Sequence, residues 1–114
     1  MVGQNGKMPR YVRPAHDQIV EAAIDAFGNR ARVAILSYVR EHGPCTRGDI
    51  ASALSIAPPT ISNHLAALEA AGLIDSAPPR EHAKSGQWLR YSVAPERITE
   101  LYKALGRELG QRID

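Results

Sequence analysis

The sequence predicts a mostly α-helical domain that carries one small β-hairpin. Apolar residues recur at helical spacing in several segments, and prolines or small polar residues stand ahead of most of them. Two short segments later in the chain have the composition of strands, and the second alternates apolar and polar residues. The 114 residues are enough for one domain with a modest core.

Composition limits the classes of protein to consider. The net charge is only +2, so affinity for nucleic acid would have to come from local placement of charge. The single cysteine, Cys45, cannot form an intrachain disulfide and is typical of a reducing compartment. No apolar run approaches the roughly 20 residues that span a bilayer, and residues 1–14 lack the apolar stretch of a signal peptide. We expect a cytoplasmic protein with no membrane partner.

Residues 1–14 predict a flexible basic arm ahead of a folded domain at 15–114. The arm contains glycines and prolines, few large apolar groups, and the basic residues Lys7, Arg10 and Arg13 with no acid. Such an arm could lie along phosphates or enter a minor groove. It could equally be a solubilising tail.

Two helices are expected next. The first, residues 16–27, is apolar over so wide an arc that it should bury one side in its own domain and the other against a partner. Asn29 is a good N-cap for the second, which runs to about Glu41. Arg30 and Arg32 lie mostly outside its apolar face.

A helix-turn-helix is predicted after the break at Gly43-Pro44. Thr46 and Asp49 form a capping-box-like pair for a short helix at 47–54, and a turn of about three residues follows. The next helix, 58–71, begins with two prolines that suit a first helical turn, and Gly72 closes it.

The helix at 58–71 has one apolar face and one small polar face. The polar face carries Thr60, Ser62 and Asn63, which are uncharged hydrogen-bonding residues suited to a DNA major groove. Taken alone, the segment favours an ordinary amphipathic helix with a solvated face. The helix before it and the hairpin after it favour a recognition helix.

The hairpin that follows predicts a wing. Its strands are 73–77 and 88–93, and the polar loop 78–87 between them carries Arg80 and Lys84. Basic loops beside a recognition helix commonly contact phosphate or the minor groove. The alternative is a solvated hairpin tip, and we favour DNA contact because of the helix-turn-helix in front of it.

The last helix begins at Pro95 and shows a continuous apolar stripe. The stripe comprises Ile98, Leu101, Tyr102, Leu105, Leu109 and Ile113. The first and last helices have more apolar surface than so small a domain needs. We expect them to form a homodimer interface, which would present two recognition helices to successive major grooves.

In this order of elements, three segments resemble the winged-helix transcription regulators of the ArsR type. The segments are GNRARVAILSYV, APPTISNHLAALEAAGLI and GQWLRYSVAP, and the resemblance covers about residues 15–110. It implies a winged helix-turn-helix of order α-α-α-α-β-β-α and a dimeric repressor that leaves its operator when a ligand binds. The effector, a small molecule or a protein, is not identified by the residues.

By matching positions, the resemblance places Thr60, Ser62, Asn63 and His64 in the major groove. The full set of expected DNA contacts is Thr60, Ser62, Asn63, His64, Arg80, Lys84, Arg90, Arg30 and Arg32. The paired cysteines and the histidines of the family's metal sensors have no counterpart here. We therefore expect no metal and no cofactor, and treat Cys45 as a small buried residue rather than a redox or metal site.

The sequence also bears on two other classes of function. The segment from Thr46 to Val93 contains as many basic as acidic residues. The four basic residues are Arg47, Arg80, Lys84 and Arg90, and the four acidic residues are Asp49, Glu69, Asp75 and Glu81. That balance motivates a winged-helix module that binds protein instead of DNA. An enzyme is not expected, because the chain has no Gly-rich phosphate loop, nucleophile elbow or carboxylate pair in a pocket-forming context.

Overall fold

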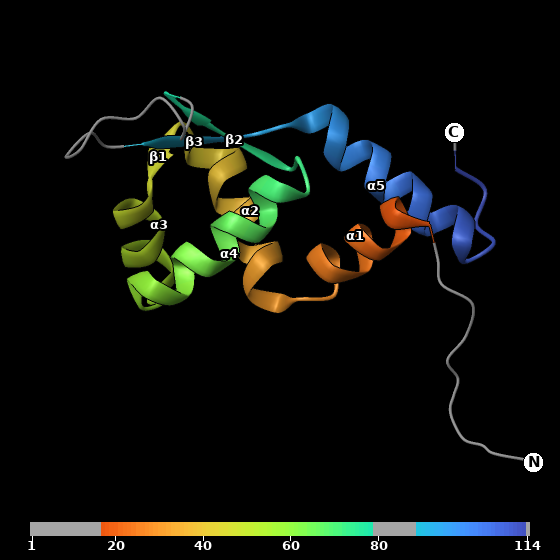
Figure 1. The fold of residues 1–114 in the computed structure, drawn as a ribbon, viewed down its shortest axis with the longest axis horizontal. Helices are drawn as coiled ribbons and strands as arrows, with labels where there is room; N and C mark the ends of the chain where they lie inside the picture. Colours follow the sequence, from red (N-terminus) through yellow and green to blue (C-terminus); the bar gives the residue numbers. More distant parts are fainter. Residues whose placement is uncertain (1–16, 79–88, 114) are drawn as a thin grey trace, which may run out of the picture.

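The computed structural model describes residues 17–78 and 89–113. Its elements are α1 (Gln18–Phe27), α2 (Arg30–His42), β1 (Cys45–Thr46), α3 (Arg47–Leu54), α4 (Pro58–Ala70), β2 (Ile74–Ala77), β3 (Arg90–Val93) and α5 (Pro95–Glu108). Figure 1 shows α2, α3, α4 and the sheet gathered at one end of the molecule, with α1 and α5 side by side at the other. The expected arm at 1–14 and most of the wing loop lie outside the described residues.

The predicted fold class is confirmed, with one addition to the sheet. Strands β2 and β3 form the expected antiparallel hairpin, with Ile74 opposite Val93. A third strand, β1, pairs with the free edge of β3, so that Cys45 lies opposite Tyr91. A strand of two residues is too short to show an alternating pattern, so the sequence predicted only the two strands of the hairpin.

The core is built where α2, α3 and α4 meet the sheet. Its fully buried large side chains are Ile35, Val39, Ile50, Ile61, Leu65, Leu68, Leu73, Ile74 and Leu101. The buried residues of α4 are Ile61, Leu65 and Leu68. They form one apolar face at helical spacing, and this face packs into the core as predicted. The opposite side of α4 remains open to solvent.

The helix ends carry the expected local signals. The Asn29 side chain accepts a hydrogen bond from the Arg32 backbone N–H at 3.0 Å, which caps α2. Thr46 and Asp49 form a complete capping box at the start of α3. Prolines occupy the first turns of both α4 and α5.

The last helix is shorter than the sequence predicted. The apolar stripe to Ile113 indicated a continuous helix, but α5 ends at Glu108 and Gly110 adopts a φ of +75°. The chain then folds back, and the Gln111 backbone N–H donates to the Gly106 carbonyl. A methyl group on Gly106 would lie 2.7 Å from Cδ1 of Ile113. Ile113 therefore packs onto α5 as a returning tail, because Gly110 permits the left-handed turn.

Candidate nucleic-acid interface

Helices α3 and α4 form a compact helix-turn-helix. The turn between them depends on Ser55, which has a φ of 55° and donates its backbone N–H to the Ala51 carbonyl. Ile50 of α3 and Ile61 of α4 are both fully buried, so the two helices share one core. This packing fixes which side of α4 faces outward.

The outward side of α4 carries the residues predicted to read DNA. Thr60 and Asn63 are exposed, and Ser62 and His64 are half-buried. All four lie in the first two turns of the helix, behind Pro58 and Pro59. Two of them are already engaged within the protein.

Ser62 is held by an arginine that the sequence did not single out. The exposed guanidinium of Arg47 donates from Nη1 to the Ser62 Oγ at 3.0 Å. Arg47 is the first residue of α3, and it follows Thr46, whose partner across the sheet is Arg90. Arg47 thus brings positive charge next to the recognition helix, and Arg90 lies beside the start of α3. Fifteen residues separate Arg47 from Ser62, and only the packing of α3 on α4 brings them together.

His64 is joined to Arg32, so two residues expected to contact DNA independently are in contact with each other. The Arg32 Nε–H donates to His64 Nδ1 at 3.1 Å. The same guanidinium forms an ion pair with Asp25 of α1. Burial lowers the pKa of His64, and the Arg32 charge lowers that pKa further. Neutral His64 therefore carries its proton on Nε2, the nitrogen left for any other partner.

The remaining predicted contacts are dispersed. Arg30 is exposed at the start of α2, and Arg90 is exposed on β3 beside the start of α3. Arg80 and Lys84 belong to the loop that lies outside the described residues.

Cys45 is a core residue of the sheet. It is 3% exposed, and burial raises the pKa of its thiol, with the Asp49 charge adding to the rise and the Arg90 charge opposing it. A protonated thiol is a poor nucleophile and a poor metal ligand. Within residues 17–78 and 89–113, no three or more His, Cys, Asp or Glu side chains gather as a metal site.

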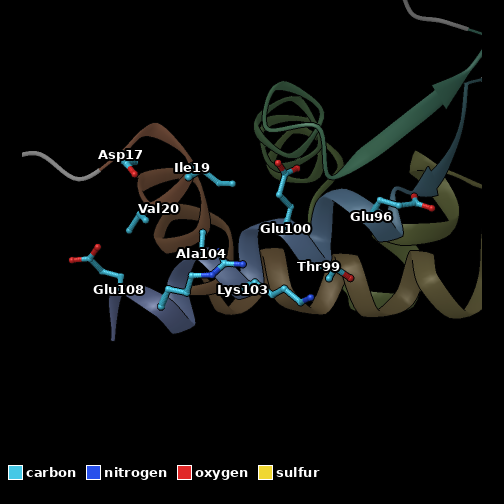
Figure 2. A pocket seen from close by; sticks show the side chains of 10 residues that line it. Asp17, Ile19, Val20, Glu96, Thr99, Glu100, Lys103, Ala104 and Glu108 are labelled. Atoms are coloured by element: carbon cyan, nitrogen blue, oxygen red, sulfur yellow. The ribbon is translucent and has the colours of Figure 1, made fainter. Parts of the chain in front are cut away.

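An open groove of about 790 Å³ lies between α1 and α5. Residues at the start of α1 and along most of α5 line it. Figure 2 shows the side chains that line it, with charged groups around the apolar residues. The lining residues are Asp17, Ile19, Val20, Glu96, Thr99, Glu100, Lys103, Ala104, Arg107 and Glu108. The groove lies on the helices that were expected to bind a second copy of the chain.

A helix-turn-helix followed directly by a β-hairpin and a long terminal helix defines the winged helix-turn-helix class. The family model for bacterial regulatory proteins of the arsR family matches residues 29–76. The uncharacterized HTH-type transcriptional regulator MJ1325 of Methanocaldococcus jannaschii is 33% identical over 78 residues, which cover 68% of this chain and 81% of that protein. The chain belongs to the ArsR family of winged-helix transcriptional regulators.

Solved structures share this fold at lower sequence identity. An ArsR-like transcriptional regulator from Rhodococcus sp. RHA1 is 23% identical, with a TM-score of 0.63 and coverage of 81% of this chain and 80% of that one. The homodimeric winged helix-turn-helix DNA-binding domain of Mb0332 from Mycobacterium bovis is 24% identical, with a TM-score of 0.58 and coverage of 81% and 79%. MepR of Staphylococcus aureus, in its complex with DNA, is 24% identical, with a TM-score of 0.54 and coverage of 82% and 77%.

The family and the fold are those of transcriptional regulators and not of enzymes. Among the helices that the structure describes, none combines the length and apolar character needed to cross a membrane.

Proposed function

We propose that this chain is a homodimeric repressor that reads an inverted repeat in double-stranded DNA. In each subunit α4 enters the major groove, and the wing loop at 78–87 lies on the flanking backbone. The observation that carries the proposal is the outward face of α4, where exposed Thr60 and Asn63 lie beside Ser62 on a helix-turn-helix. Uncharged amide and hydroxyl groups discriminate base edges without supplying much affinity.

Affinity in this proposal comes from basic residues around α4, which itself has no Arg or Lys. Arg47 and Arg90 flank the start of α3, and Arg30 is exposed on α2. Arg80 and Lys84 of the wing loop and the basic arm at 1–14 add charge from segments outside the described residues. These side chains would contact phosphates, whose binding does not depend on sequence.

Selection of bound sequences from random DNA tests the proposal. Purified protein should enrich an inverted repeat whose half-sites are centred about 10 base pairs apart. The Asn63→Ala variant should relax base preference at one position of each half-site, and Lys84→Ala should weaken binding to all sequences about equally. The reverse pattern would show that the two roles are wrongly assigned.

A second candidate function is a winged-helix module that binds protein. The balance of four basic and four acidic residues from Thr46 to Val93 favours it. The same selection separates the two functions, because a protein-binding module would enrich no DNA sequence at low salt. Failure to retain any DNA would count against the repressor and in favour of this module.

A further inference from the structure

The guanidinium group of Arg32 joins three helices at one point. Arg32 lies on α2, and its Nε–H donates to Nδ1 of His64 on α4 at 3.1 Å. Its Nη1 donates to the carboxylate of Asp25 on α1. The Arg32 side chain is only 18% exposed, whereas that of Asp25 is 71% exposed. The recognition helix is therefore tied to the first helix of the chain through one side chain.

This arrangement differs from that of a phosphate contact. A guanidinium has five N–H donors in a fixed plane, and here two of its directions are already used inside the protein. The Asp25 carboxylate also neutralises the charge that would attract a phosphate. Arg32 has the geometry of a structural link, although the sequence grouped it with the DNA contacts.

We propose that Arg32 is a positioning residue that sets the orientation of α4 relative to α1, and thereby the sequence selectivity of DNA binding. The proposal rests on the proposed function. It adds that selectivity depends on a residue that does not touch DNA.

The physical basis is the place of His64 on α4. The apolar residues Ile61, Leu65 and Leu68 hold one side of the helix in the core. His64 follows Asn63 directly, so a hydrogen bond at His64 restrains the rotation of the helix on its outward side. A small rotation about the helix axis would displace Asn63 from any base edge that it contacts.

The link also connects α4 to the helices proposed for dimerisation. Asp25 is on α1. Among the elements that the structure describes, α1 and α5 form the most extensive contact. In a dimer, the contacts of Arg32 with Asp25 and His64 would thus hold each recognition helix in a defined position relative to the interface. A defined position is needed because the repeat of the DNA helix sets the distance at which two recognition helices can enter successive major grooves.

The test compares DNA selectivity in Arg32→Lys, Asp25→Ala and a control, Arg40→Lys. Lysine keeps the charge but lacks the planar fork that reaches His64 and Asp25 together. Selectivity is the ratio of the Kd for random duplex to the Kd for the selected repeat, measured by fluorescence anisotropy at several salt concentrations. Urea unfolding first establishes that each variant is folded.

Arg32→Lys should lower the ratio about tenfold, the equivalent of one charge-assisted hydrogen bond, and leave the salt dependence unchanged. Asp25→Ala should lower the ratio in the same direction, about threefold, because it loosens only the far end of the link. Arg40→Lys, on the exposed side of α2, should match the wild type. An unchanged ratio in Arg32→Lys, or an equal loss of affinity for all DNA, would overturn the proposal.

A DNA-free readout covers the case in which Arg32→Lys does not fold. Nitrogen-15 NMR of the wild type should show His64 as the Nε2–H tautomer, with Nδ1 in its acceptor form. A Nδ1–H tautomer would overturn the link. If the wild type selects no DNA sequence, the proposed function fails and the positioning role fails with it. Selection by the wild type with normal selectivity in both variants rejects the positioning role alone.

Discussion

Thr46 and Asp49 show how two side chains can define the start of a helix. The Asp49 backbone N–H donates to the Thr46 Oγ at 3.1 Å, and the Thr46 backbone N–H donates to the Asp49 carboxylate at 3.0 Å. The bonds from the Thr46 backbone and hydroxyl lower the pKa of Asp49, and the Arg90 charge lowers it further. The pair holds α3, and with it Arg47, next to the recognition helix.

Asp49 should therefore titrate below the usual range for an aspartate. Because its pKa is lower in the folded than in the unfolded chain, its contribution to stability is complete above the ordinary Asp range. That contribution is lost as the pH falls through the folded pKa. Thr46→Ala should raise the pKa of Asp49 towards its ordinary value, since one of the hydrogen bonds disappears. Carboxyl carbon-13 NMR against pH measures both values, with Thr99→Ala on α5 as the control. An ordinary titration of Asp49 in the wild type would contradict the capping box.

At the scale of elements, local residues define both ends of α4, whereas its orientation does not follow from local residues. Pro58 and Pro59 begin it, and Gly72 follows its last residues with a φ of +78°. The Gly72 N–H donates to the Glu69 carbonyl and the Leu73 N–H to the Leu68 carbonyl, which together form a Schellman motif. The sequence therefore predicted the helix bounds to within one residue. Its orientation depends on partners that the sequence leaves unspecified.

Gly72→Ala should lower the free energy of unfolding by about 1–2 kcal/mol, because alanine is strained at positive φ. The added methyl group would also lie 3.4 Å from Arg97 Nε, which bonds the end of the same helix. Gly48→Ala is the matched control, and it should raise stability by about 0.5–1 kcal/mol. Gly48 lies within α3, where a methyl group meets only ordinary contacts. Urea unfolding measures both, and equal shifts of the same sign would contradict the Schellman geometry.

At the scale of the whole molecule, α1 and α5 leave large apolar side chains exposed. Ile24 is 44% exposed, Tyr102 is 62% exposed and Leu109 is 65% exposed. Tyr102 and Leu109 are seven residues apart on or next to α5 and share one side of it. We expect a second copy of the chain to cover this surface, because so much exposed apolar area on two adjacent helices is typical of an interface.

Tyr102→Glu should weaken the proposed dimer at least about tenfold, because it places a charge in the interface and removes apolar contact area. The fold should persist, since Tyr102 is exposed within one subunit. Sedimentation equilibrium measures the dimer constant, and affinity for the inverted repeat should fall with it. Ser52→Glu, on the exposed side of α3, is the control and should remain dimeric. A Tyr102→Glu protein that stays dimeric at low concentration would place the interface elsewhere.

The sequence by itself determined the fold class, the bounds of most helices and the outward face of α4. These follow from local rules: apolar spacing, prolines at helix starts, the Thr46–Asp49 pair and Gly72 all act within a few residues. Only the tertiary structure decided that Arg32 contacts His64 and that Arg47 reaches Ser62. It also decided that β1 completes the sheet and that Ile113 turns back onto α5. Such contacts depend on how helices cross and how short segments find partners across the chain, and no periodicity in the sequence encodes those distances.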